Sequence, residues 1–341
     1  MSYRIKTHGR IGVELQRVAE QEIAAAVAEL QSLDRSDLGE AVHEARKHFK
    51  KLRALVQLLR EPLGAKCVRA EQAFYRDTGR EFQRLRDAQA LIATLEKLAR
   101  RFFEQRRPPI IAAAHRVLAA EAQRAHRVLA KQGRWAAVVA SLGEARGRIA
   151  AWKLDDYRWK DLRVALQRSY RRACEAWRHA CSEPKPRALH NWRRRTKDFL
   201  YHITLCHSAA PDFMEELAGE LEVLGEFLGD DHDLVILRAL LEQRASVDCV
   251  DSVDCTAEKR RKGAQKRGSL RALPAGKARE AFFKMLALRR EELLDAAFDL
   301  AGRIFLESPG EFIDALDTRR DEHRQRHQKV RRMAERLVAR H

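Results

Sequence analysis

Two groups of basic residues in this sequence have the same spacing. Each group begins with a histidine and continues with three cations, at steps i, i+3, i+4 and i+7. On a helix, these four positions form one ridge. Cations three and four residues apart repel one another, which destabilises a helix unless an anion lies beside them. The spacing therefore predicts two basic ridges that hold an anion between them: His43, Arg46, Lys47 and Lys50 on the first, and His190, Arg193, Arg194 and Lys197 on the second.

Each ridge lies opposite an apolar stripe. Both stripes have the spacing 3, 4, 3, 4, 3, and each member of the second follows its counterpart by 147 residues, as the ridge residues do. Such a stripe is typical of the buried face of an amphipathic helix. The shared offset predicts an internal duplication, with the stripe residues Val42, Ala45, Phe49, Leu52, Val56 and Leu59 in the first half and Leu189, Trp192, Thr196, Phe199, Ile203 and Cys206 in the second.

A shorter pair of elements follows the ridges. Residues 85–91 contain Asp87, which lies 44 residues after His43, and residues 228–237 contain Asp233, which lies 43 residues after His190. Each aspartate could orient a nearby basic side chain through a charge-assisted hydrogen bond. The alternative is a helix cap or a structural ion pair. The sequence leaves both interpretations open.

Helical periodicity covers nearly the whole chain, and no alternating pattern of useful length predicts a strand. We therefore expect a single all-α domain of two similar helical bundles, at 10–150 and 151–310, followed by a basic C-terminal helix at 311–341. Residues 246–277 contain a basic cluster, 259–262, which belongs either to a solvated loop or to an arm that binds anions. The predicted helices cover residues 10–31, 38–60, 68–106, 110–132, 134–150, 159–181, 188–207, 212–243, 278–305 and 310–340.

The composition narrows the class of protein. The 341 residues include 67 Lys and Arg against 49 Asp and Glu, a formal net charge of +18, and 50 of the 67 cations are Arg. Arg presents a planar fork of donors that suits phosphate oxygens, so the excess indicates a polyanion as partner. The sequence contains no run of about 18 apolar residues, so we expect no membrane span. Six cysteines without a C-x-x-C pair predict neither a disulfide framework nor a zinc site. We expect a cytoplasmic protein without metal or cofactor.

The two basic segments resemble the signature motifs of the CHAD family, the conserved histidine α-helical domain. Residues 42–53, VHEARKHFKKLR, are similar to its first motif, and residues 190–202, HNWRRRTKDFLYH, to its second. Residues 228–234 match its Leu-Gly-x-x-x-Asp-Leu element, and residues 74–80 and 170–172 fit the intervening helices. The resemblance extends over residues 10–310. Two positions depart from it: Leu200 stands where the first repeat has Arg53, and Cys174 where the family often has Arg.

The resemblance implies two helical bundles related by a pseudo-two-fold axis around a basic groove or pore. It also implies that inorganic polyphosphate threads this groove and that the protein is found at polyphosphate granules. Carried over position by position, the implied contacts are His43, Arg46, Lys47, Lys50, Arg53, Arg76, Arg80, Arg171, Arg172, His190, Arg193, Arg194, Lys197 and Tyr201.

Binding of linear polyphosphate without catalysis is the leading interpretation, because the chain has no Walker A, H-E-x-x-H or G-x-S-x-G motif. A nucleic-acid-binding protein is the alternative, and it would place aromatic side chains among the cations for base stacking. Only Tyr201 lies near them. A polyphosphate or triphosphate hydrolase is less favoured, because it needs acidic metal ligands and Asp87 and Asp233 are the only candidates. The sequence predicts no oligomeric state.

Overall fold

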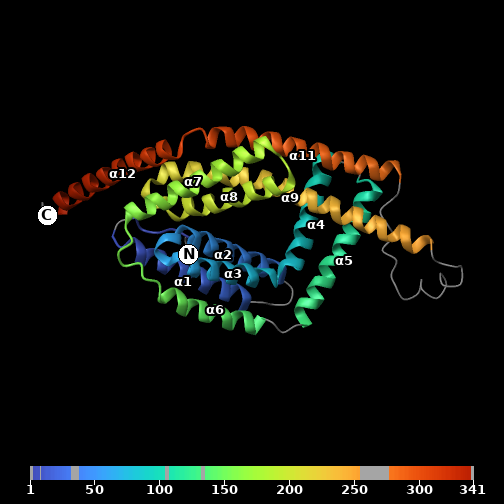
Figure 1. Cartoon of the computed structure of the whole chain (residues 1–341), viewed down its shortest axis with the longest axis horizontal. Coiled ribbons are helices and arrows are strands. Elements are labelled where there is room, and N and C mark those ends of the chain that lie inside the picture. Colours follow the sequence, from blue (N-terminus) through green and yellow to red (C-terminus); the bar gives the residue numbers. More distant parts are fainter. Residues whose placement is uncertain are drawn as a thin grey trace.

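A computed structural model of the chain describes residues 3–7, 9–31, 38–103, 107–131, 135–253 and 276–338. Within these residues every regular element is a helix, which confirms the predicted all-α fold (Figure 1). The helices are α1 (Ile11–Gln31), α2 (Leu38–Leu58), α3 (Arg60–Arg80), α4 (Gln83–Phe102), α5 (Pro109–Lys131), α6 (Trp135–Ala150), α7 (Trp159–Ser182), α8 (Pro186–Leu205), the 3-10 turn η1 (His207–Ala209), α9 (Pro211–Val253), α11 (Lys277–Ile304) and α12 (Pro309–Val338).

Two helix boundaries differ from the prediction. The single helix expected at 68–106 is divided into α3 and α4 by a turn at Glu81 and Phe82. Glu81 keeps right-handed helical angles (φ −54°, ψ −30°), and the chain changes direction at Phe82 (φ −102°, ψ 0°), three residues after Gly79. In addition, α3 begins at Arg60, and the break expected between residues 60 and 68 is a kink within this helix. The kink contains Gly64 with φ 75°, a conformation that glycine adopts without steric cost.

The loop predicted at 246–277 is only partly described. Its first residues are helical, because α9 continues to Val253. Residues 254–275, with the basic cluster 259–262, lie outside the described residues. Residues 339–341 of the predicted C-terminal segment do so as well.

The helices pack in the same order in both halves. In the first half α1 packs on α2 and α6, and in the second α7 packs on α8 and α12. Likewise α2 packs on α3 as α8 packs on α9, and α4 packs on α5 as α9 packs on α11. Between the halves, α2 packs on α8 and α4 on α9. This repetition fits the predicted duplication, and Figure 1 shows α1, α2, α3 and α6 on one side of the molecule and α7 and α8 on the other.

The hydrophobic core does not divide at the predicted boundary between the repeats. Its larger cluster includes Phe49 of α2 together with Trp192 of α8, and both are at most 2% exposed. A second cluster combines α4 and α5 with α9 and α11, for example through Leu95 and Leu237. Each cluster draws on both repeats, so the two halves form one packed body.

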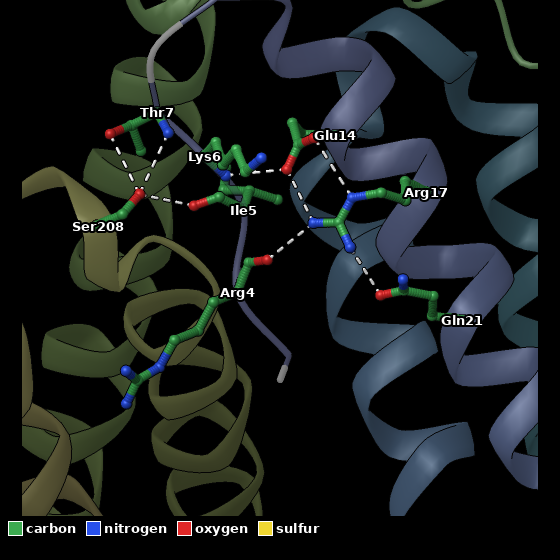
Figure 2. Close-up of polar contacts among 8 residues, drawn as sticks. All are labelled: Arg4, Ile5, Lys6, Thr7, Glu14, Arg17, Gln21 and Ser208. Carbon is green, nitrogen blue, oxygen red and sulfur yellow. Dashed lines mark hydrogen bonds and ion pairs between the residues drawn. The ribbon is translucent and has the colours of Figure 1, made fainter. Parts of the chain in front are cut away.

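The N-terminal segment, residues 3–7, is bound to the second half of the chain. Ile5 donates its backbone N–H to the carbonyl of Leu205 at the end of α8, at 2.9 Å. The hydroxyl of Ser208 donates to the carbonyl of Ile5 at 2.6 Å and accepts from the N–H of Thr7 at 3.1 Å. The segment thus follows η1 and the end of α8 (Figure 2).

The same segment is also bound to the first half. The N–H of Lys6 donates to Glu14 Oε2 of α1 at 3.0 Å. Arg17 of α1 forms an ion pair with Glu14 at 2.8 Å and donates to the carbonyl of Arg4 at 3.1 Å. Figure 2 shows these bonds on the opposite side of the segment from Ser208, so the segment ties α1 to the second half.

Candidate functional site

The two predicted ridges lie on α2 and α8 and face away from the core. The twelve residues of the opposite apolar stripes are at most 4% exposed, as the spacing predicted. Burial of one face fixes the rotation of an amphipathic helix about its axis. The ridges are therefore held on the other face of each helix. Because α2 packs directly on α8, they also lie next to each other.

Lys50 lies where the two ridges meet. Its ammonium group is close to the positive charges of Arg193 and Lys197 of the second ridge and Arg46 of its own. Burial, followed by the charge of Arg193, lowers the pKa of Lys50 to about 7. Its side chain is nevertheless exposed to the water of the adjoining cavities, which screens part of this effect. An anion beside Lys50 would relieve the repulsion.

Two cavities adjoin the ridges, and four side chains line both of them: Lys50, Arg193, Lys197 and Tyr201. The smaller one, which we call the basic cavity, has a volume of about 490 Å³. Eight of its lining side chains are Arg or Lys, and only Asp198 is a carboxylate. Besides the four shared residues, the predicted contacts that line it are Arg46, Arg53, Arg76, Arg80, His190 and Arg194.

The larger cavity, which we call the mixed cavity, has a volume of about 1080 Å³. It receives His43 and Lys47 of the first ridge, and in total eight Arg or Lys side chains line it. Six carboxylates offset these cations: Glu40, Glu215, Glu222, Glu226, Asp230 and Asp233. A polyanion would therefore meet a large excess of cations only in the basic cavity, although Asp77 is paired with two of them, Arg76 and Arg80.

Three pairs of corresponding positions account for this difference in charge. Arg76 and Arg80 of α3 correspond, 146 residues later, to Glu222 and Glu226 of α9. Arg53 corresponds, 147 residues later, to Leu200. In each pair the first residue lines the basic cavity and the second lines the mixed cavity. The two cavities thus occupy matching places in the two halves, and the first half carries the cations.

Two glycines of α9 leave room for the second ridge. A Cβ atom at Gly225 would lie 2.6 Å from Cε and 2.8 Å from Nζ of Lys197. At Gly229 it would lie 3.4 Å from Nε of Arg193. Carbon atoms attract one another at about 3.5–4.0 Å and repel at 2.6 Å. The ammonium of Lys197 therefore occupies its place only because residue 225 has no side chain.

Arg46 and Arg193, at the same position of the two ridges, have similar surroundings. The Nε atom of each is buried without a hydrogen-bond partner, and Arg46 donates through Nη1 to the carbonyl of Gly79. The strongest favourable charge on Arg46 is that of Asp87, and on Arg193 it is that of Asp233. The two aspartates therefore act on the ridge arginines through their charge, which fits both the orienting role and a structural ion-pair role.

The surroundings of the two ridge histidines disfavour their protonated form. Partial burial lowers the pKa of His43 and of His190, and the charge of Arg86 on His43 and of Arg193 on His190 acts in the same direction. The ring of His232 lies 4.9 Å from that of His190, between centroids. Burial, with the charge of Arg193, lowers the pKa of His232 to about 4. A bound polyanion would favour protonation of these rings.

Two predicted contacts lie elsewhere. Arg171 is exposed on α7, with Nε 3.9 Å from Glu175 Oε1. Arg172 lines a separate small pocket beside His202. Tyr170, which is 1% exposed, fixes the rotation of α7 and turns these two positions away from the cavities. The remaining predicted contacts line one or both cavities: His43, Arg46, Lys47, Lys50, Arg53, Arg76, Arg80, His190, Arg193, Arg194, Lys197 and Tyr201.

The sequence analysis missed Arg86, and also His232, which lies beside His190 but lines neither cavity. Arg86 lines the mixed cavity, and its charge acts on His43 and Lys50. The signal was present, because Arg86 directly precedes Asp87 as His232 precedes the corresponding aspartate, 146 residues later. A comparison of positions 86 and 232, each directly before an aspartate of the pair, would have found both.

The helices that carry the two ridges match a known protein family. The model of the CHAD domain matches residues 17–242, more than half of the chain, and this range includes both ridge helices and residues 228–234. The chain belongs to the CHAD family. The match is shorter than the range of 10–310 expected from the motifs. No curated protein matches this CHAD chain.

The polar groups of the CHAD site are mainly nitrogen donors. Guanidinium and ammonium groups bind oxyanions and not metal cations. In the part of the chain that the structure describes, no three His, Cys, Asp or Glu side chains are placed to hold a metal ion. None of the helices searched in that part is both long and apolar enough to cross a membrane.

Proposed function

We propose that this CHAD protein binds linear inorganic polyphosphate in the basic cavity, without chemistry of its own, and acts at polyphosphate granules. The charge of the basic cavity carries the proposal, with eight Arg and Lys side chains against one carboxylate. Polyphosphate presents charged oxygens along its whole length. Guanidinium forks can therefore engage it at every unit, with no base or sugar to accommodate.

A chain longer than the basic cavity would continue into the mixed cavity. The side chains that line both cavities, among them Lys50 and Tyr201, would contact it at the boundary. Burial raises the pKa of Tyr201 to about 12, so its hydroxyl is a hydrogen-bond donor at neutral pH. Beyond the boundary, Glu222 and Glu226 oppose a polyanion. Binding should therefore be strongest in the basic cavity.

The aromatic side chains of the basic cavity favour a polyanion without bases. Proteins that bind single-stranded nucleic acid stack bases on exposed aromatic faces. Three aromatic residues line the basic cavity, but Phe49 and Tyr75 are at most 2% exposed. Only Tyr201 offers an accessible ring, and that ring already contacts Tyr3 at 6.3 Å between centroids.

A hydrolase is less well supported. Metal-assisted hydrolysis of phosphate needs several carboxylates near the substrate. The one carboxylate of the basic cavity, Asp198, lies 3.5 Å from Arg195. Asp87 does not line this cavity, and Asp233 lines the mixed cavity instead.

The test is a titration of the purified protein with long-chain polyphosphate, single-stranded DNA and duplex DNA at equal concentrations of charge. We expect polyphosphate to bind most tightly. With about eight cations engaged and a coefficient near 0.7 for single strands, the slope of log K against log salt should be about −6. Equal affinity for all three polymers, or a slope shallower than about −2, would contradict the proposal.

A pair of matched variants locates the site. Arg76→Ala with Arg80→Ala removes two cations of α3 from the basic cavity. Lys66→Ala with Arg69→Ala removes the same charge from exposed positions of the same helix, outside both cavities. We expect the first pair to weaken polyphosphate binding and to make the salt slope shallower by about 1.4, and the second to change neither appreciably. Equal losses in both pairs would place binding outside the cavity.

A further inference from the structure

The first part of α12 is anchored to the rest of the molecule. A capping box starts the helix, since Ser308 N–H donates to Glu311 Oε2 at 2.7 Å and Glu311 N–H donates to Ser308 Oγ at 3.3 Å. Asp317 accepts a hydrogen bond from Trp159 Nε1 of α7 at 2.9 Å. One turn later, Arg320 lies over the ring of Trp159, 4.2 Å from its centroid, and is 9% exposed.

Beyond Arg320 the helix keeps only an edge contact with the start of α9, where Glu322, His323 and Arg326 line a small pocket, and it then leaves the molecule. Every side chain described from Asp321 to Arg332 is exposed, except the half-buried His323. Figure 1 shows this part of α12 projecting from one end of the molecule, past α7 and α8. The corresponding helix of the first half, α6, has 16 residues, whereas α12 has 30. The duplicated architecture therefore accounts for the anchored part and not for the projecting extension, residues 321–338.

The extension is strongly basic. Residues 323–332 contain five Arg or Lys, two His and no carboxylate. Arg326 lies 3.9 Å from Glu322, but Arg324, Lys329 and Arg332 form no ion pair with another described residue. A helical segment with so few packing contacts is marginally stable in water, and like charges at these spacings weaken it further. A bound polyanion would remove that repulsion.

From these observations we infer that the part of the extension with described side chains, residues 321–332, forms a second binding surface for linear polyphosphate, so that one molecule holds two polyphosphate segments at once. The inference rests on the proposed function of the basic cavity. No residue of α12 lines either cavity. A second segment, or a second chain, can therefore be held on the extension while the first occupies the cavity, and the protein crosslinks polyphosphate.

The charge of the extension favours binding of polyphosphate over binding of a second copy of the protein. Two such helices side by side would bring ten cations of residues 323–332 together without a carboxylate to pair with them. Like charges across an interface cost several kcal/mol. A polyanion reverses the sign of that interaction, and contacts at two sites raise the overall affinity for a long chain by about 10²–10⁴-fold.

The test compares two triple variants. Arg324→Gln, Lys329→Gln and Arg332→Gln neutralise the extension and leave the cavities intact. The control neutralises three exposed cations of the body that line no cavity: Lys66→Gln, Arg69→Gln and Arg116→Gln. For each protein, light scattering with long-chain polyphosphate reports crosslinking. Titration with a polyphosphate too short to reach both surfaces removes the bridging contribution, and its tighter binding step reports the basic cavity.

We expect the wild-type protein and the control to scatter light with long-chain polyphosphate and the extension variant to do so weakly. The extension variant should lose about 10²-fold in affinity for the long chain and keep its affinity for the short one. Undiminished scattering by the extension variant, an equal loss in the control, or loss of duplex DNA binding alone would overturn the inference. So would a wild-type dimer that the extension variant converts to a monomer. Failure of the wild type to bind polyphosphate of either length would instead refute the proposed function.

Discussion

Substitution of Gly225 by alanine should weaken polyphosphate binding while making the protein more stable. The new methyl group would lie 2.6 Å from Cε and 2.8 Å from Nζ of Lys197, which is too close by about 1 Å. Because the end of a lysine side chain is flexible, the ammonium group moves and the helix stays intact. Replacing glycine by alanine inside a helix also adds about 0.5–1 kcal/mol to stability.

The expected loss in binding follows from the contact that is removed. A hydrogen bond between an ammonium and a phosphate oxygen contributes about 1.5–3 kcal/mol. Its loss raises Kd by about 10–100-fold, and the salt slope becomes shallower by about 0.7. Calorimetric titration with polyphosphate measures both quantities. Thermal unfolding in the absence of ligand should show an unchanged or higher Tm.

Two further variants make this prediction specific. Gly219→Ala lies in the same helix and also lines the mixed cavity, but its methyl group would have no neighbour within 4 Å. It should raise stability without affecting binding. In a Lys197→Ala background, Gly225→Ala should cause no additional loss, because the displaced group is already gone. The reasoning is refuted if Gly225→Ala binds polyphosphate like the wild type, or if its effect persists in the Lys197→Ala background.

Three other predictions follow from the charges. Glu222→Arg with Glu226→Arg replaces two carboxylates of the mixed cavity by cations, as in the basic cavity. Polyphosphate should then contact more cations, and the slope of log K against log salt should become steeper. A weaker affinity for polyphosphate would contradict this. Because the pKa of Lys50 is lowered to about 7 and a polyanion raises it, affinity should rise as the pH falls from about 10 to 7. Titrations over this range should show that the rise is absent in Lys50→Arg. Burial lowers the pKa of His202 from 6.5 to about 4 in the folded state, so the free energy of unfolding should fall by up to about 3 kcal/mol as the pH drops through that interval. Urea unfolding at several pH values measures this, and a flat profile would refute it.

The ridges and their buried stripes could be predicted because helical geometry is local. The steps i, i+3, i+4 and i+7 define one face whatever the helix packs against. The offset of 147 residues then showed that the same face occurs twice. The charge of each cavity was also within reach of the sequence. Comparison of Arg76 with Glu222 at the offset of 146 already distinguishes a basic cavity from a mixed one.

Other features depend on tertiary packing and left no local signal. The fit of the Arg171–Arg172 segment to the family pattern could not show that the burial of Tyr170 turns both arginines away from the cavities. The turn between α3 and α4 occurs at Glu81 and Phe82, neither of which is a residue type that ends helices. The path of α12 beyond Arg320 depends on its packing, because Arg320 contacts Trp159, the first residue of α7. No residue type in 311–341 indicates where this contact ends.

The tie formed by residues 3–7 has a consequence for how the chain acquires its structure during synthesis. Ser208, which binds the carbonyl of Ile5, follows it by 203 residues. At a translation rate of about 5–20 residues per second, roughly 10–40 s separate the emergence of these two partners from the ribosome. Contacts between residues so distant in sequence slow folding, because a large loop must close before they form. Residues 3–7 are therefore held in their final place only after η1 has been made, and a nascent chain that stops before residue 208 lacks the partner that joins them to the second half.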